Sequence, residues 1–373
     1  MAQRYYFDWA ATALPGGIPP ETGAFGNPSS LHTEGREGRK RLEEARSRCA
    51  AALGVRPETL CFSSGGTESN AIAVFSQLFR RGACLYSAVE HPSVRENCRV
   101  LERLGRPVDS IPVEADGRVS EACLARALEK RPDTRFAAIM AVNNETGALN
   151  DMAALTAALR RRGPVHIHCD MVQALGKVPV DISAWDIDSA SLSAHKLGGP
   201  RGIGLLYLKK PLEPLYRGGG QEGGIRPGTE NTAGALALAA CLEEYTQGLE
   251  SAWREAARRL DRLMRGLESL GRCRPIPQDR RNGEDGRFSP YIFQAAFDGV
   301  PGEVMVRALD QAGFAVSTGS ACSSSKEGRP VLEAMGVDPK LRLEGIRISQ
   351  GRSTGDEEID LLVRAAGACL EYL

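Results

Sequence analysis

The sequence predicts an α/β protein: a large domain with a mostly parallel sheet that helices cover on both faces, and a smaller α+β domain. Between about residues 58 and 210, short apolar runs alternate with helix-length amphipathic segments. These apolar runs are continuous, as in parallel strands that are buried on both faces. After about residue 270 the alternation stops. We therefore expect a large domain over residues 15–250 and a small domain over 1–14 and 251–373.

The expected elements follow in chain order. Strands of the large domain are expected at residues 60–62, 83–87, 108–112, 136–142, 165–169, 189–193 and 202–208. The helices between them are expected at residues 67–81, 92–104, 120–130 and 152–161. After a glycine-rich stretch we expect one long helical run at 231–270, strands at 291–297 and 345–349, and helices at 302–312 and 356–372. Thr354 followed by Glu357 predicts a capping box at the start of the last helix.

Length, composition and charge narrow the class of protein. The 373 residues are enough for a substantial core, and 42% hydrophobic with 25% charged residues is ordinary for a folded chain. Lys plus Arg and Asp plus Glu both number 47, so the net charge is zero, which argues against nucleic-acid binding. The longest apolar stretch, about residues 233–242, is too short to cross a bilayer, and the N-terminus lacks a signal-peptide layout. We expect a cytoplasmic protein that binds neither nucleic acid nor membrane.

The ten cysteines lack the spacing of a metal site. The closest pair, Cys49 and Cys61, is twelve residues apart, and no C-x-x-C occurs. His166, His168 and Cys169 lie close together in sequence, but in a strand Cys169 points away from the two histidines. We therefore expect no metal, and we expect most of the cysteines to be small buried apolar side chains.

A turn of small residues within 62–70 is the first candidate binding site. The segment Phe-Ser-Ser-Gly-Gly-Thr-Glu-Ser-Asn is typical of a strand, a tight turn and the start of a helix. Main-chain N–H groups in such a turn and in the first helical turn bind anions, phosphate in particular. The segment matches neither the ATP-binding pattern G-x-x-x-x-G-K-[ST] nor the dinucleotide pattern G-x-G-x-x-G. The alternative is a Ser- or Thr-capped turn without a ligand.

Asp170 follows the buried apolar strand expected at 165–169, and Gln173 comes three residues later. Open α/β sheets bind their ligands at the carboxyl ends of the strands. A buried ionised carboxylate needs a partner, and a protonated pyridine nitrogen is one. Asp170 is therefore a candidate for binding a pyridine ring.

Lys196 is the best candidate for a reactive amine among the eight lysines. It follows the strand expected at 189–193, and small or apolar residues surround it. The other lysines lie in charged segments or in turns, and we expect Lys177 in a turn of this kind. A desolvated lysine has a lowered pKa and suits a Schiff base, whereas the alternative is an amine that reaches solvent. A phosphate cradle, an Asp for a pyridinium and such a lysine are together the groups that pyridoxal phosphate requires.

Several motifs resemble those of the cysteine desulfurases, a family of fold-type I, class V aminotransferase-like enzymes that use pyridoxal phosphate. The motifs are Gly66-Thr67-Glu68-Ser69-Asn70, Glu90-His91-Pro92, Val142-Asn143-Asn144-Glu145-Thr146-Gly147, Asp170-x-x-Gln173 and Ser193-x-His195-Lys196. The resemblance runs from residues 7–12 to residues 346–349, so it covers essentially the whole chain. It implies a fold-type I homodimer with pyridoxal phosphate as cofactor.

The resemblance also implies a role for each site residue. Lys196 would bind the cofactor covalently and then take the Cα proton of the substrate. Asp170 would stabilise the pyridinium, and Gln173 would bond the ring hydroxyl oxygen. His91 would stack on the ring and act as an acid or base. The other expected contacts are Gly66, Thr67, Ser193 and His195 at the phosphate, Thr229 reaching it from a partner subunit, Asn144 at the cofactor, and Asn144 with Arg347 at the substrate carboxylate.

Cys322 is expected to be the one reactive cysteine. It lies in a run of small residues, 317–325, that lacks a periodic apolar pattern. This run resembles the Ser-Gly-Ser-Ala-Cys loop of the iron–sulfur-cluster class of desulfurases. The resemblance implies that L-cysteine becomes L-alanine, that Cys322 receives the sulfur as a persulfide, and that a protein acceptor takes it for iron–sulfur assembly or thio-modification. The alternative is an incidental cysteine in a flexible linker.

Two other functions stay open at this point. Another pyridoxal-phosphate enzyme of the same fold, such as a small-amino-acid aminotransferase or a selenocysteine lyase, would keep Lys196 and Asp170 but would not need Cys322. The other alternative is a non-catalytic sulfur-transfer or assembly scaffold that retains the fold, and the presence of all three residues argues against it. The segments at 218–231 and 8–12 differ in detail from the pattern of the family, which bears most on the role of Thr229.

Overall fold

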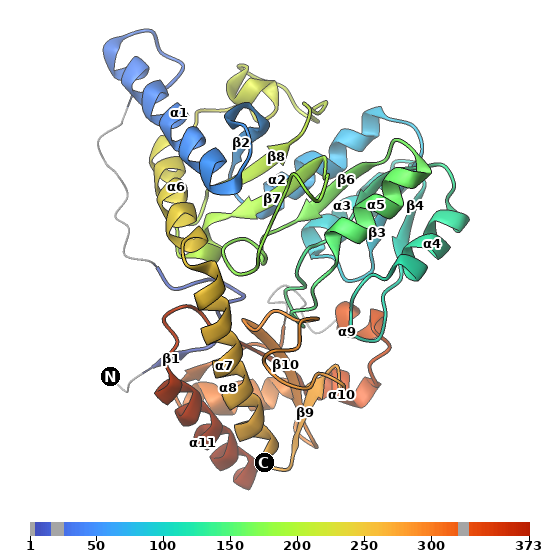
Figure 1. The fold of residues 1–373 in the computed structure, drawn as a ribbon, viewed down its shortest axis with the longest axis vertical. Helices are drawn as coiled ribbons and strands as arrows, with labels where there is room; N and C mark the ends of the chain where they lie inside the picture. The colour runs from blue at the N-terminus through green and yellow to red at the C-terminus, as the bar shows by residue number, and fades with distance from the viewer. Residues whose placement is uncertain (1–3, 16–25, 320–327) are drawn as a thin grey trace.

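A seven-stranded sheet is the centre of the larger part of the molecule (Figure 1). The computed structural model describes residues 4–15, 26–319 and 328–373. The strands, in their order across the sheet, are β2 (Leu60–Ser63), β8 (Gly204–Leu208), β7 (Ser189–Ser193), β6 (His166–Asp170), β5 (Thr134–Ala138), β3 (Ala83–Ser87) and β4 (Val108–Ile111). Only β8 among them runs antiparallel to its neighbours, β2 and β7. The prediction of a mostly parallel sheet is confirmed.

Helices cover both faces of this sheet, and alternate residues of β5 show how. Phe136 and Ala138 pack in one apolar cluster with residues of α2 and α3, whereas Ala137 and Ile139 pack in another with residues of α4 and α5. Successive side chains of a strand point to opposite faces, so a continuous apolar run requires cover on both sides. The helices of this part are α1 (Thr33–Leu53), α2 (Gly66–Phe75), α3 (Pro92–Arg103), α4 (Glu121–Lys130), α5 (Met152–Arg162) and α6 (Thr232–Thr246).

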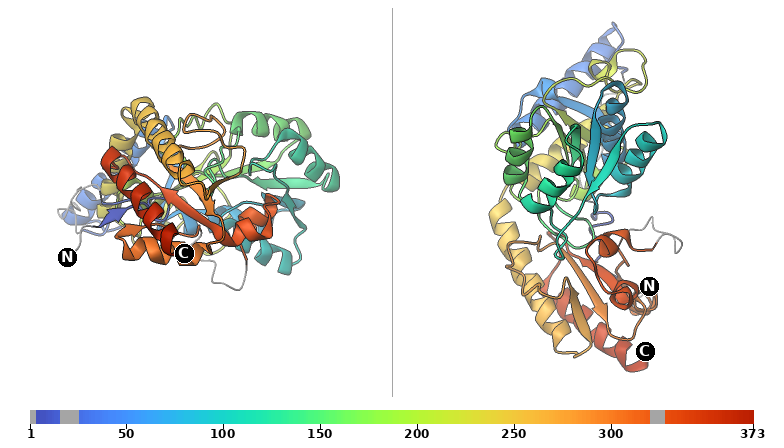
Figure 2. Two further views of the ribbon diagram at one scale, coloured as in Figure 1. Left: turned by 90° about the horizontal axis from the view of Figure 1, so that it is seen from below. Right: turned by 90° about the vertical axis from the view of Figure 1, so that its right-hand side faces the viewer.

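The smaller part contains a three-stranded antiparallel sheet with its own apolar core (Figure 2). Its strands, in order, are β12 (Gly345–Ser349), β10 (Ile292–Phe297) and β9 (Cys273–Ile276). Its helices are α7 (Leu249–Glu268), α8 (Gly302–Gln311), α9 (Pro330–Ala334), α10 (Pro339–Glu344) and α11 (Asp356–Tyr372). A short strand near the N-terminus, β1 (Tyr5–Tyr6), pairs with β11 (Phe314–Ala315). The N-terminal segment therefore lies with the smaller part, while the domain limits at residues 15 and 250 stay a prediction.

Four details of the predicted elements are wrong. The helix expected at 67–81 ends at Phe75, and a short 3-10 turn, η2 (Ser76–Phe79), follows it. The helical run at 231–270 is two helices, because Gly248 breaks it with a left-handed conformation at φ +61°. The strand expected at 136–142 ends at Ala138. The capping box does not form. At the N-cap Gly355, one residue later than expected, only the glutamate half is present: the Glu358 carboxylate accepts from the Gly355 N–H at 2.8 Å, and glycine has no side chain for the other half. The Thr354 hydroxyl instead accepts from the Gly351 N–H at 3.0 Å. The hydroxyl is thus used within its own turn and is not the cap.

The glycine-rich stretch before α6 is anchored by a buried ion pair. Glu222 accepts from the two Nη atoms of Arg46 at 2.8 and 2.9 Å and from the Phe62 N–H at 2.7 Å. The Glu222 side chain is 1% exposed and that of Arg46 is 9% exposed. The free-energy cost of removing these two charges from water is offset only while they are paired. The ion pair therefore holds the glycine-rich stretch against β2.

No helix within the described ranges combines the length and the apolar character that crossing a bilayer requires.

We expect Glu222→Ala to lower the free energy of unfolding by about 3 kcal/mol, because it leaves the Arg46 guanidinium buried without its main partner. Urea unfolding followed by circular dichroism measures this. The matched control is Glu250→Ala, which breaks an exposed pair with Arg254 on α7 and should change stability by less than about 0.5 kcal/mol. Equal effects of the two substitutions would contradict the role given to Glu222.

Candidate active site

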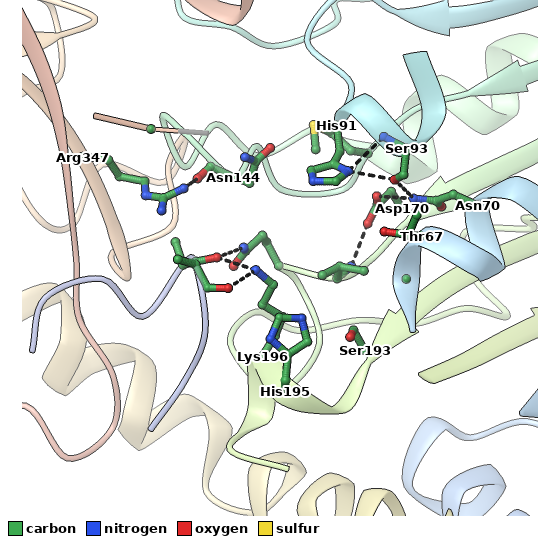
Figure 3. Close-up of a pocket in the computed structure, with 17 residues that line it drawn as sticks. Thr67, Asn70, His91, Ser93, Asn144, Asp170, Ser193, His195, Lys196 and Arg347 are labelled. Atoms are coloured by element: carbon green, nitrogen blue, oxygen red, sulfur yellow. Dashed lines mark hydrogen bonds between the residues drawn. The ribbon is translucent and has the colours of Figure 1, made fainter. Parts of the chain in front are cut away.

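A cavity of about 280 Å³ lies where β6 and β7 end, between the two parts of the molecule (Figure 3). Asp170 is the last residue of β6 and Ser193 the last residue of β7, so the cavity lies at the carboxyl edge of the sheet. The smaller part contributes Arg347 from β12. The structure brings ten of the predicted site residues together around this cavity: Gly66, Thr67, His91, Asn144, Asp170, Gln173, Ser193, His195, Lys196 and Arg347.

The turn before α2 forms an uncapped helix N-terminus at one end of the cavity. No side chain caps α2 at Gly65, so the first-turn N–H groups are available to an anion. A Cβ atom on Gly66 would lie 2.6 Å from Val172, and one on Gly204 would lie 2.5 Å from Gly65, so the close approach here requires glycine. The hydroxyl groups of Thr67 and Ser193 and the ring of His195 lie beside this turn, which gives a cradle that fits a phosphate group.

His195 is a neutral member of this cradle at pH 7. Burial, and to a smaller extent the nearby charge of Lys196, lowers its pKa to about 4. Its Nδ1 lies 3.1 Å from the Thr12 hydroxyl, which comes from the N-terminal segment. His195 therefore offers a hydrogen bond to an anion and not a positive charge.

The Asp170 carboxylate is buried and partly satisfied by the protein. Its Oδ2 accepts from Asn70 Nδ2 at 2.8 Å, and its Oδ1 accepts from the Val172 N–H at 3.0 Å. It is 5% exposed and lines the cavity. A buried carboxylate that faces a cavity suits a cationic partner there, and a protonated ring nitrogen fits this requirement.

Lys196 reaches the cavity from η3 (Ala194–Leu197), the short turn after β7. Its Nζ donates to the main-chain carbonyls of Ala10 at 2.6 Å and Ala11 at 2.7 Å. Gln173 Nε2 donates to the same Ala10 carbonyl at 2.8 Å. The amine lies inside the cavity wall, which fits a Schiff-base lysine better than one that extends to solvent.

Lys177 is not the turn lysine that the sequence predicts, because it is buried with 6% exposure. Its Nζ donates to Gln173 Oε1 at 3.1 Å. Burial, and to a smaller extent the positive charges of Lys196 and Arg347, lowers its pKa to about 7. Lys177 therefore sets the orientation of the Gln173 amide, whose NH₂ group faces Ala10. Nothing in the local sequence indicates this, because the surrounding wall comes from distant segments.

Arg347 is the largest charged group of the wall and is 2% exposed. It pairs with Asp8 at 2.7 Å and donates to the Asn144 carbonyl at 2.9 Å. Its buried Nε has no hydrogen-bond partner among the described residues. A guanidinium held in this way can bind a carboxylate in the cavity with its remaining donors.

Two predicted site residues are not in this cavity. Thr229 is exposed and does not line the cavity of its own chain, so its contact across a dimer stays a prediction. Cys322 lies outside the described residues. Seven of the nine described cysteines are buried, and burial raises the pKa of Cys49 and Cys273 to about 12, which makes them poor nucleophiles. The wall also contains residues that sequence reasoning gave no role: Ala10, Ala11, Asn70, Ser93, Met140, Val172 and Gly319.

Comparison with known proteins identifies the family. The aminotransferase class-V family model matches residues 6–362. The chain is a cysteine desulfurase of this family. It is 35% identical to the cysteine desulfurase IscS of Dictyoglomus turgidum, over 100% of this chain and 96% of the relative, and 38% identical to a cysteine desulfurase of Cereibacter sphaeroides, over 100% and 97%. A solved structure of a NIFS-like protein superposes with a TM-score of 0.89 at 32% identity and full coverage of both chains.

We expect Lys177→Met to stabilise the protein at pH 7 and to do so less as the pH rises. The amine has a pKa of about 7 in the folded chain and an ordinary value of 10.5. Below pH 7 the amine is charged in both states, so folding bears the full free-energy cost of burying the charge; above pH 10.5 it is neutral in both states and this cost is gone. Urea unfolding of wild type and variant at about pH 7 and about pH 9.5 measures the difference. A stability difference that does not change with pH would show that the buried amine does not titrate in this range.

Proposed function

We propose that the chain uses pyridoxal phosphate to remove sulfur from L-cysteine, with L-alanine as product and Cys322 as the first sulfur acceptor. The observation that carries the proposal is the convergence of three groups on one cavity: the uncapped turn at Gly66, the Asp170 carboxylate and the Lys196 amine. Each of these groups meets one chemical demand of the cofactor, namely phosphate, ring nitrogen and aldehyde.

Different residues of the cavity wall would bind different parts of the cofactor. The turn at Gly66, with Thr67, Ser193 and His195, would hold the phosphate group. Asp170 would hold the ring nitrogen, Gln173 the ring hydroxyl oxygen, and His91 would cover the ring. When bound, the cofactor withdraws electrons from the bonds at the substrate Cα.

The remaining residues would act on the substrate. Arg347 and Asn144 would hold its carboxylate, which turns the side-chain sulfur away from the β12 side of the cavity. Lys196 would take the Cα proton and would return it to Cα when alanine forms. The Cys322 thiolate would attack the substrate sulfur, so that an S–S bond forms, the C–S bond breaks, and the electron pair stays on the substrate β-carbon, which then takes a proton to become the methyl group of alanine. A protein acceptor would take the sulfur from the Cys322 persulfide, and a homodimer would bring Thr229 to the phosphate of the other subunit.

We expect mass spectrometry after addition of L-cysteine to show one additional sulfur on the peptide that contains Cys322. Cys322→Ala should abolish this gain, because seven of the nine described cysteines are buried. Cys369→Ala is the matched control: Cys369 is partly exposed on α11, away from the cavity, and its loss should leave persulfide formation unchanged. Alanine release that continues in Cys322→Ala, or transamination with a keto acid, would favour another enzyme of the same fold.

We expect Asp170→Ala to weaken cofactor binding at least about 100-fold, because it removes the only carboxylate that lines the described cavity wall. Equilibrium dialysis of pyridoxal phosphate against the stripped full-length chain measures the affinity. The control is Asp151→Ala at the start of α5, which removes an exposed helix cap and should leave the affinity unchanged. Unchanged binding in Asp170→Ala would refute the orientation proposed for the ring.

A further inference from the structure

A continuous chain of hydrogen bonds runs behind the cavity wall from β6 to the start of α3. His166 Nε2 and His168 Nδ1 both lie 2.8 Å from the Ser189 hydroxyl. His168 Nε2 lies 2.8 Å from Asn70 Oδ1. The Asn70 amide nitrogen lies 2.8 Å from both Asp170 Oδ2 and the Ser93 hydroxyl. The chain ends at His91.

Asn70 is the branch point, and its orientation follows from Asp170. A carboxylate accepts hydrogen bonds and cannot donate them, so the group of Asn70 that faces it is the NH₂ group. Asn70 Oδ1 then faces His168, whose Nε2 must carry a proton. His168 Nδ1 is consequently an acceptor. Burial keeps His168 neutral, because it lowers the pKa of the ring to about 3. Asn70 is 1% exposed, so water does not compete for these bonds.

The other branch determines where His91 carries its proton. The Ser93 oxygen accepts from Asn70, so its hydrogen is free to point at His91 Nδ1, 2.7 Å away. The main-chain N–H of Ser93 points at the same Nδ1 at 3.1 Å, and His91 is thereby the N-cap of α3. Two donors aimed at one nitrogen leave no room for a proton on it. The proton of His91 is therefore on Nε2.

Figure 3 shows the two bonds from Ser93 on one side of the His91 ring, while the opposite side of the ring faces the open space above Lys196. The charged groups around His91 are Asp170, Lys196 and Arg95. Burial lowers the pKa of His91, Asp170 raises it, and the two cations lower it, with a net decrease. The N-terminus of α3 also disfavours a cation at this position.

We propose that Asn70 is a positioning residue: it orients Asp170 and, through Ser93, holds His91 in its neutral form with the single proton on Nε2, toward the cavity. His91 would then act as a ring cover and a neutral hydrogen-bond donor. Donation by a neutral imidazole is an established way for an enzyme to polarise a substrate without an imidazolium.

The chemical consequence rests on the proposed function. A His91 that does not take a second proton on Nδ1 cannot cycle as an acid between imidazolium and imidazole. Proton transfer at the substrate would then belong to Lys196, which narrows the acid or base role expected for His91. The pH profile of persulfide formation should therefore contain no ionisation step from His91. The profile of His91→Gln should accordingly have the same steps as that of the wild type.

The test is the protonation state of the His91 ring in the full-length holoenzyme, measured by NMR with histidine labelled at the ring nitrogens and Cε1. The chain has five histidines, and the signals of His91 are identified by their loss in His91→Gln. At about pH 7.5 we expect a protonated Nε2 and an unprotonated Nδ1, and we expect this form to persist as the pH falls to the ordinary pKa of histidine, about 6.5. A protonated Nδ1 at pH 7.5, alone or together with Nε2, overturns the proposal.

Asn70→Asp tests the branch point. The substitution replaces the NH₂ donor at position 70 by an acceptor. The hydroxyl hydrogen of Ser93 then turns away from His91 toward position 70, and the Ser93 oxygen can accept from His91 Nδ1–H. We expect the pKa of His91 to rise by at least about one unit. The matched control is Asn97→Asp on α3, the helix of Ser93. It adds the same charge outside the hydrogen-bond chain, because Asn97 donates to the Ser93 main-chain carbonyl at 2.7 Å. Equal shifts in the two variants would show an effect of charge alone and would refute the role of Asn70.

Ser93→Ala removes the hydroxyl through which Asn70 acts and keeps the main-chain donor to His91 Nδ1. We expect the pKa of His91 to rise while Nε2 stays the protonated nitrogen of the neutral ring, which keeps the proposal testable if Asn70→Asp does not fold. An unchanged pKa of His91 in Ser93→Ala would refute the role of Asn70. A change to the Nδ1 tautomer in this variant would contradict the part given to the helix N-terminus. None of these spectra requires turnover. A chain that forms no persulfide but has the expected tautomer would refute the proposed function and leave this inference standing.

Discussion

The buried carboxylate of Asp170 is the group on which the rest of the site depends. Removing an ionised carboxylate from water costs several kcal/mol unless hydrogen bonds and a counter-charge replace the lost water. The protein supplies two donors, from Val172 and Asn70, and leaves the remaining direction open to the cavity. Asn70 can serve Asp170 only in one orientation, and this orientation in turn fixes the hydrogen-bond directions of Ser93 and His168. A single charge thus organises a large part of the wall.

The N-terminal segment is the second organising element, because it joins the two parts of the molecule at the cavity. The Ala10 carbonyl accepts from both Lys196 and Gln173, while the Ala10 N–H donates to the Ser349 hydroxyl at 2.9 Å. Ser349 also donates its main-chain N–H to Phe7 at 2.8 Å. The segment therefore connects the Schiff-base candidate of the larger part with β12 of the smaller part, next to Arg347.

Sequence patterns predicted the sheet and most of the wall, because those features are local. Continuous apolar runs mark strands that are covered on both faces. The positions of Asp170 and Ser193 in the wall could be predicted directly, because these residues lie at the carboxyl ends of two such strands. The motifs that resemble the cysteine desulfurases supplied roles for these residues and brought in Arg347 from the far end of the chain.

Features that depend on tertiary packing were beyond the sequence. Lys177 lies in a segment of turn residues, and only the folded wall buries it against Gln173. The bonds of Asn70 to Ser93 and Asp170 join positions 23 and 100 residues apart, and no spacing rule connects such positions. The capping box expected at Thr354 was wrong for a similar but more local reason, since the Thr354 hydroxyl accepts from the Gly351 N–H and does not cap the last helix.

We propose that sulfur moves in this cavity from cysteine to Cys322, and a single turnover is the sharpest test of this transfer. The holoenzyme in excess is mixed with L-cysteine in the absence of any reductant or acceptor, and alanine and protein-bound persulfide are both quantified. We expect equal amounts of alanine and persulfide, with the persulfide on Cys322. Pyruvate with free sulfide, or alanine without an equal amount of persulfide on Cys322, would contradict this proposal.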